Sequence, residues 1–182
     1  MAFVVAFVPG VTPGKWERIW RERVPRVPLE LRPSSADHAL TALRDGTAQM
    51  ALLRDTDADD EFHAIPLYRE RPVVVASRDH LLAALDAHEE VALADLADDT
   101  LLGPPEHDPL SADTVALVTA GVGVAIMPQS VARAHSRRDV VARVVAGAPD
   151  TGISLVWRAD RPGELVDTFV GIVRGRTANS SR

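Results

Sequence analysis

Three short apolar runs mark the first 53 residues of the chain. Ala2–Val8 is a continuous run of β-branched and aromatic residues, too short for a buried helix and ended by Pro9-Gly10. It therefore predicts a central strand of a parallel sheet. Val27–Leu31 and Met50–Leu53 are similar runs and predict two further strands.

Two amphipathic segments separate these strands. The first predicts a helix with one apolar face, formed by Trp16, Ile19, Trp20 and Val24. The second begins at Ser34-Ser35, and Gly46 ends it. The order β-α-β-α-β is typical of a doubly wound α/β lobe, in which parallel strands end at the same edge of the sheet.

The middle of the chain predicts two strands and then a second lobe. His63–Tyr68 and Pro72–Ser77 are the two strands, and the sequence becomes polar and rich in alanine after them. The second lobe is expected to hold a strand at Thr100–Leu102, a helix capped by Ser111, a strand at Val124–Met127, a short helix from Gln129 and a strand at Val140–Val145.

A last strand and helix complete the pattern. Gly152–Trp157 predicts the strand, and Asp160–Arg174 predicts the helix, with Asp160 as a candidate N-cap and Pro162 in the first turn. The buried stripe of this helix is expected to be Leu165, Val166, Phe169, Val170 and Val173.

Composition narrows the class of protein. The 182 residues include no cysteine, which excludes disulfide scaffolds and thiolate metal sites. The longest apolar runs are about half the length that a bilayer requires, so we expect a cytoplasmic protein without a membrane partner. The net charge of −6 and the scattered basic residues argue against direct contact with nucleic acid.

The segment Thr119–Val131 (TAGVGVAIMPQSV) joins a helix to a buried strand through Gly121 and Gly123. Its glycines precede the strand, and Ile126 stands where a dinucleotide fingerprint needs glycine or alanine. A tight turn and close packing suffice to explain them, and no cofactor is expected.

This segment also resembles the G-x-G-[VIL]-A-[LIV]-[LIVM]-P segment of the effector-binding domain of LysR-type transcriptional regulators. Other segments follow in that family's order. They are LELRP (Leu29–Pro33), LRDGTAQMAL (Leu43–Leu52), HAIPLYRERPVVVA (His63–Ala76), DHLLA (Asp79–Ala83), LADLAD (Leu93–Asp98) and TVALVTAGVGVAIMP (Thr114–Pro128).

The resemblance implies two doubly wound α/β lobes joined by a hinge, similar to periplasmic binding proteins. Residues 1–76 and 153–182 would form lobe I of the effector-binding domain, and residues 77–152 lobe II. The second crossing between the lobes would lie near Ile153–Arg158. A small-molecule effector would bind in the cleft between the lobes, and the domain would form a homodimer.

The sequence departs from the family's pattern in two places. It starts directly at the first strand, without the N-terminal winged helix-turn-helix of these regulators. Only GPPEHDPLSAD lies between Leu102 and Thr114, where the family usually has a further helix and strand, so the second lobe is expected to be shortened.

Loops at the strand ends and the helix N-termini after them are the candidate ligand-binding residues. Such N-termini present free N–H groups and a positive dipole end, which suit a carboxylate or phosphate. The candidates are Val11, Thr12, Pro13, Gly14, Lys15, Ser34, Ser35, Gln129 and Ser130. Lys15 opposes the helix dipole, which suggests a counter-anion; alternatively it points into solvent and Glu17 or Glu22 compensates it. N-capping alone would explain one of the two serines.

Enzyme and metal chemistry find little support. The sequence has no G-x-S-x-G, P-loop or H-E-x-x-H motif, and only His107-Asp108 could do acid–base work. The acidic run Asp55–Glu61 favours a solvated loop over a metal site. Trp16 and Trp20 favour a core or a dimer surface over ligand stacking.

We therefore expect a sensor of a small, anionic metabolite that is not an enzyme and carries no metal or cofactor. The alternative is a protein-interaction module that pairs with a regulator without sensing a ligand. An enzyme on the same scaffold would need titratable groups that converge on one cleft, and fold analogy does not decide among these classes.

Overall fold

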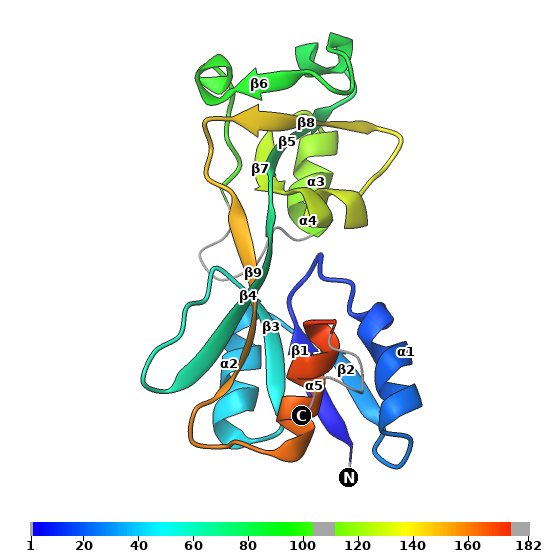
Figure 1. Cartoon of the computed structure of the whole chain (residues 1–182). Helices are drawn as coiled ribbons and strands as arrows, with labels where there is room; N and C mark the ends of the chain where they lie inside the picture. The colour runs from blue at the N-terminus through cyan, green and yellow to red at the C-terminus, as the bar shows by residue number, and fades with distance from the viewer. Residues whose placement is uncertain (1, 104–111, 176–182) are drawn as a thin grey trace. The chain divides into compact units, whose positions relative to one another are not determined.

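The structure is a computed structural model that describes residues 2–103 and 112–175. Its contacts divide the chain into two compact units. Unit 1 comprises Met1–Tyr68 and Gly152–Arg182, and unit 2 comprises Arg69–Thr151. Figure 1 labels the strands and the α-helices of both units.

Unit 1 contains a five-stranded sheet in the order β2-β1-β3-β9-β4. Its strands are β1 (Phe3–Phe7), β2 (Leu29–Pro33), β3 (Met50–Arg54), β4 (Phe62–Glu70) and β9 (Thr151–Arg158). β1 pairs in parallel with β2 and β3, as the apolar runs predicted. β9 returns antiparallel to β3, with Leu155 opposite Leu52.

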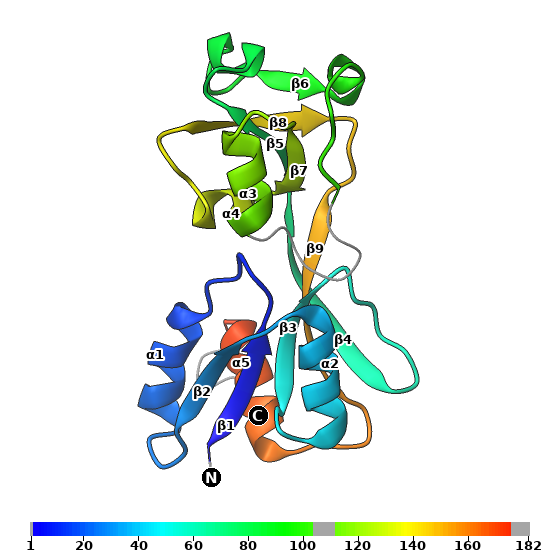
Figure 2. The same cartoon turned by 180° about the vertical axis from the view of Figure 1, so that it is seen from behind.

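Three helices cover this sheet: α1 (Gly14–Arg23), α2 (Ala36–Asp45) and α5 (Glu164–Val173). α2 and α5 lie on opposite faces of it (Figures 1 and 2). The predicted helix ends are confirmed for α2, because the Ser35 hydroxyl accepts the His38 N–H and Gly46 has a left-handed φ of 81°.

An aromatic cluster fills the core beneath α1 and α5. The Phe3 and Trp20 rings stack with centroids 4.7 Å apart, and the Phe169 ring lies 5.9 Å from Phe3 and 5.8 Å from Trp20. The Trp20 indole N–H donates to the Val27 carbonyl at 2.8 Å, so its polar atom is satisfied inside the core. The interpretation of Trp16 and Trp20 as core residues is confirmed, since they are 5% and 1% exposed.

Unit 2 contains a four-stranded sheet in the order β6-β8-β5-β7. The strands are β5 (Pro72–Ser77), β6 (Glu90–Ala92), β7 (Ala125–Pro128) and β8 (Val140–Ala146). Its helical segments are η1 (Leu81–Ala84), η2 (Leu93–Leu96), α3 (Ala112–Thr119) and α4 (Gln129–Ala134). β7 and β8 both run antiparallel to β5.

β5 is the centre of this unit because both of its faces are buried. Val73 and Val75 pack in one cluster with residues of α3 and α4, while Val74 and Ala76 pack in another with Leu82 and Leu96. Alternating side chains of one strand thus serve two cores. The sequence-based boundary at residues 76 and 77 had left this strand in the first lobe, whereas its pairing belongs to the second sheet.

Two local predictions are wrong in detail. Thr100–Leu102 forms a single parallel bridge, Leu101 to Val124, where a strand was expected. Asp160 does not cap the last helix, because both of its carboxylate oxygens accept from the Arg158 guanidinium; α5 begins after Gly163, and Pro162 precedes it. The predicted Ser111 cap, the His107-Asp108 pair and most of the shortened segment lie outside the described residues.

Candidate functional site

The carboxyl ends of β2, β1 and β3 meet at one edge of the unit 1 sheet, because the three strands are parallel. Hydrogen bonds join these exits. The Ser34 N–H donates to the Phe7 carbonyl at 3.0 Å, and the Val8 N–H donates to the Leu52 carbonyl at 3.1 Å. The loops that follow the strands therefore start from fixed points, which is what a binding edge requires.

The loop between β1 and α1, together with the first residue of α1, holds four of the predicted residues. Val11 is buried in the core and its N–H donates to the Val8 carbonyl at 3.3 Å, so neither group is free for a ligand. Pro13 is also buried and is the N-cap of α1, with its carbonyl accepting from Trp16 at 2.9 Å. Thr12 and Gly14 are exposed.

Lys15 lies in the first turn of α1 with an exposed side chain. Its ammonium nitrogen is 4.7 Å from the centroid of the Trp16 ring, a cation–π contact. The two acids that could have compensated it are engaged elsewhere, since Glu17 pairs with Arg21 at 2.9 Å and Glu22 with Arg18 at 3.7 Å.

Ser34 and Ser35 are half-buried between β2 and α2. Ser35 is the N-cap: its hydroxyl accepts the His38 N–H at 3.4 Å and lies 2.9 Å from His38 Nδ1. Among the residues that the structure describes, the Ser34 hydroxyl has only a long 3.5 Å contact, to the Arg32 carbonyl. Capping thus accounts for Ser35, and Ser34 has the more available hydroxyl.

Gln129 and Ser130 belong to unit 2 and open α4, which is only six residues long. The Gln129 N–H donates to the Arg71 carbonyl at 3.1 Å, so it is already paired. The Ser130 hydroxyl is buried and has no hydrogen-bond partner among the described residues. These two residues therefore offer side chains rather than a strong helix N-terminus.

Arg54 is a residue at this edge that the sequence reasoning missed. It ends β3, is half-buried, and its Nη2 donates to the Pro9 carbonyl at 3.3 Å. A guanidinium thus lies against the loop that carries Thr12 and leads into α1. Met50–Leu53 was predicted to be a parallel strand that ends at this edge, and this prediction could have placed the next residue, Arg54, there.

The acidic run after Arg54 serves local structure. One Asp59 carboxylate oxygen accepts the N–H groups of Glu61 and Phe62, at 2.8 and 2.6 Å. Asp55 binds the backbone of Gly152. Within the described residues no group of three potential ligand side chains is arranged to hold a metal ion.

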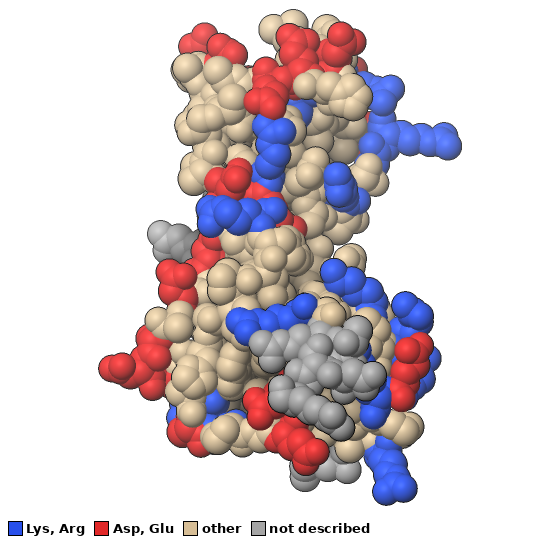
Figure 3. Space-filling model, viewed as in Figure 1, with Lys and Arg blue, Asp and Glu red and all other residues tan. Residues whose placement is uncertain are grey.

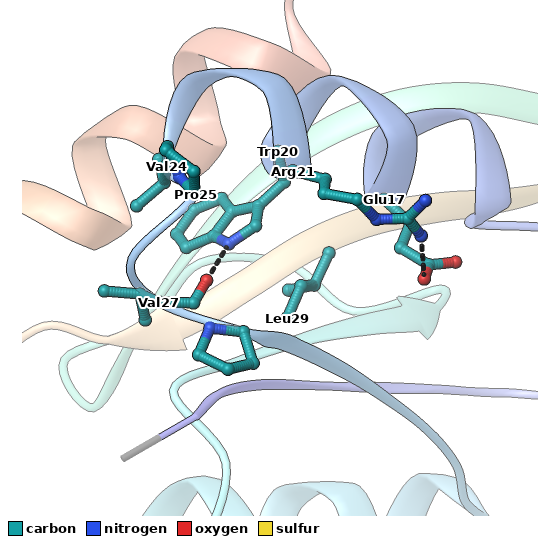
Figure 4. Close-up of a pocket in the computed structure, with 8 residues that line it drawn as sticks. Glu17, Trp20, Arg21, Val24, Pro25, Val27 and Leu29 are labelled. Carbon is teal, nitrogen blue, oxygen red and sulfur yellow. Dashed lines mark hydrogen bonds and ion pairs between the residues drawn. The ribbon is translucent and has the colours of Figure 1, made fainter.

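The hollow in unit 1 that Figure 4 shows is at the opposite end of β2. It has a volume of about 270 Å³ and is lined by Glu17, Trp20, Arg21, Val24, Pro25, Val27, Pro28 and Leu29. It shares no residue with the predicted set. A smaller hollow in unit 2, of about 190 Å³, includes Gln129 in its lining.

Known structures resemble this fold over almost the whole chain. An OxyR mutant from Corynebacterium glutamicum has a TM-score of 0.77 at 23% identity, with 96% of this chain and 63% of that chain covered. The BenM effector-binding domain with its effector benzoate has a TM-score of 0.78 at 18% identity, with 96% of this chain and 90% of that chain covered. The OxyR regulatory domain of Pseudomonas aeruginosa, a C199D mutant, has a TM-score of 0.74 at 21% identity, with 96% of this chain and 96% of that chain covered.

The sequence itself matches one family, described as LysR substrate binding domain, over residues 15–116 and 110–178. The chain belongs to this family. The two-lobed, periplasmic-binding-protein-like fold expected from the resemblance is thereby confirmed. No curated protein matches the chain significantly. The chain spans less than two thirds of the C. glutamicum OxyR chain.

LysR substrate-binding domains belong to transcriptional regulators and not to enzymes, as the sequence predicted. Two exposed carboxyl groups of this domain have lowered pKa values because neighbouring groups donate hydrogen bonds to them: Thr47 donates to Asp45, and the Arg158 guanidinium donates to Asp160.

Charges on the surface of this LysR domain are mixed. On the face that Figure 3 shows, Lys and Arg side chains are interspersed with Asp and Glu. None of the described helices combines the length and the apolar character needed to cross a membrane.

Asp160 gives a pH prediction. The Arg158 guanidinium donates to its carboxylate and holds the pKa of that carboxyl below its ordinary value. A lowered pKa in the folded state adds stability above the ordinary pKa, and this stability is lost as the pH falls through the folded value. We therefore expect Asp160→Asn to lower the urea midpoint at about pH 7 and to have little effect near pH 2. The exposed Asp57→Asn is the matched control, and an equal loss in both variants would contradict the prediction.

Proposed function

We propose that this domain binds a small carboxylate effector at the edge of unit 1 where β2, β1 and β3 end. The observation that carries the proposal is the placement of Arg54 against the β1–α1 loop, at the same edge as Ser34. A guanidinium and a hydroxyl at one edge suit a carboxylate, which accepts hydrogen bonds from both.

The distance between the carboxyl ends of β2 and β3 supports a small ligand. β2 and β3 are separated by β1, and neighbouring strands lie about 4.8 Å apart, so the exits of β2 and β3 are roughly 10 Å apart. A compact acid can reach both. The N-terminus of α2 adds N–H groups without a helical partner and a positive dipole end on the β2 side.

Two further considerations support an anion. Lys15, in the first turn of α1, adds a second cation whose side chain is exposed, and its cation–π contact with Trp16 is a weak restraint that it can leave. BenM, which shares the fold, has benzoate as its effector. Thr12, Ser34 and Ser35 are the neutral donors at this edge.

The test is a thermal-shift screen with benzoate, other small carboxylates and phosphate. A ligand at a hundred times its dissociation constant stabilises the folded state by about 2.7 kcal/mol. We expect at least one acid to raise the Tm of the parent. The increase should fall strongly in Arg54→Gln and less in Lys15→Ala. The matched control is Arg18→Ala, which removes an exposed cation of α1 paired with Glu22 and should keep the full shift.

The outcomes separate the hypotheses. A shift that survives Arg54→Gln would place the anion elsewhere. A screen in which no acid binds would reject the sensor proposal and favour the interaction module.

We propose that the domain acts as a homodimer, as the resemblance implies. Sedimentation equilibrium measures the oligomeric state directly, and a monomer at micromolar concentration would contradict the proposal.

A further inference from the structure

The chain returns to unit 1 at Gly152, one residue into β9. Beyond this point β9 pairs with β3, and the printed register runs from Ile153 opposite Arg54 to Val156 opposite Ala51. The next pair outward is Gly152 with Asp55. In a regular antiparallel ladder two such residues exchange both backbone hydrogen bonds.

Asp55 completes this pair in an unusual way. Its N–H donates to the Gly152 carbonyl at 2.8 Å, as a ladder residue does. The reciprocal Gly152 N–H donates at 2.6 Å to Oδ1 of the Asp55 side chain. Asp55 has a φ of 48°, the only positive value at a non-glycine residue among those described, so its backbone has left the strand. The carboxylate replaces the carbonyl that an extended residue would offer.

The neighbour of Asp55 is Arg54, which contacts the Pro9 carbonyl at the proposed effector edge. Arg54 contacts the loop at the proposed effector edge, and Asp55 holds the returning strand β9. The two residues belong to unit 1 and are adjacent in the chain, so a single peptide bond links the two contacts.

We propose that Asp55 is a positioning residue that fixes where the returning chain becomes part of unit 1. With both of its backbone groups bonded to Asp55, Gly152 is held to the end of β3. This role deepens the proposed effector function, because Asp55 directly follows Arg54, the residue at the proposed effector edge. The two hydrogen bonds between Asp55 and Gly152 form a clamp that itself needs no ligand.

Asp55→Gly tests the clamp. Glycine keeps the positive φ without strain and removes only the carboxylate, so the variant separates the hydrogen bond from the backbone conformation. We expect amide hydrogen exchange at Gly152 to become about tenfold faster, as the loss of one charge-assisted hydrogen bond implies. In nitrogen-15 relaxation, the backbone order parameter of Gly152 should fall.

Two variants serve as controls. Asp57→Gly makes the same substitution at another exposed position of the acidic run and should leave the Gly152 exchange unchanged. Asp55→Asn keeps a side-chain oxygen acceptor and tolerates the positive φ, so it should retain most of the protection. Urea midpoints of all three should stay close to that of the parent, which excludes general loosening.

The proposal is overturned if Gly152 exchange in Asp55→Gly stays within twofold of the parent, or if Asp57→Gly speeds it equally. These measurements are made without ligand, so they stand apart from the effector screen. Absence of any benzoate or phosphate shift would reject the proposed function while leaving the clamp result as measured. Unchanged Gly152 exchange in Asp55→Gly, together with a normal benzoate shift of the parent, would reject this inference alone.

Discussion

Trp20→Ala is expected to lower the free energy of unfolding by about 3–5 kcal/mol, the range for removing a large aromatic side chain from a packed core. Trp20 is 1% exposed, stacks on Phe3 at 4.7 Å and contacts Phe169 at 5.8 Å. The alanine variant leaves a cavity between α1, β1 and α5, the elements that carry these rings. It also leaves the Val27 carbonyl without its indole donor.

Trp20→Phe is the matched control. It keeps a ring for the stack on Phe3 and removes only part of the volume and the hydrogen bond to Val27, so a loss of about 1 kcal/mol is expected. Urea unfolding followed by circular dichroism measures both variants without relying on the fluorescence of the substituted tryptophan. A loss below 1 kcal/mol for Trp20→Ala would mean that this cluster is not the core of unit 1.

Much of unit 1 could be predicted because its signals are local. The apolar run that became β1 is too short for a helix, and it forms a strand with parallel neighbours on both sides. Trp16 and Trp20 are four residues apart, so they share a helical face whatever surrounds them. Ser35 and Gly46 mark the ends of α2 through their own conformations.

Unit 2 and the end of the chain were less predictable because distant partners decide them. Asp160 has the chemistry of an N-cap, but the guanidinium of Arg158 takes it, and the helix starts four residues later. Leu101 is in an apolar stretch, yet it pairs at one position only. β6 is three residues long and has no clear period of its own; its parallel pairing with β8 defines it.

The candidate site divides in the same way. Parallel strand ends locate the loops of Thr12 and Ser34 from sequence alone, since the topology follows from the order of the elements. The roles of Arg54 and Asp55 depend on contacts with Pro9 and Gly152, which are 45 and 97 residues away in the chain. The paired state of the Gln129 N–H likewise depends on Arg71, so sequence could only mark it as a helix start.

Gly123→Ala is expected to destabilise unit 2 by about 2–3 kcal/mol, as forced overpacking does. A Cβ at this position would lie 2.2 Å from the Thr100 carbonyl oxygen, 3.1 Å from its Cβ and 3.2 Å from Leu102 Cγ. The nearest of these atoms is backbone and cannot rotate away. That same carbonyl accepts the Val124 N–H at 2.9 Å, so displacing it breaks the bond that holds Thr100–Leu102 beside β7.

Gly171→Ala is the matched control with the opposite sign. Gly171 is in the interior of α5, and a Cβ there meets nothing within 4 Å, so alanine should stabilise the protein by about 0.4–1 kcal/mol. Gly123→Ala should also speed amide exchange at Leu102 and Val124, whose N–H groups make the two bonds of the bridge. Unchanged exchange at both positions would contradict the packing explanation of this glycine. In that case the structure would explain only one of the two glycines of the segment, Gly121, whose positive φ of 73° favours glycine.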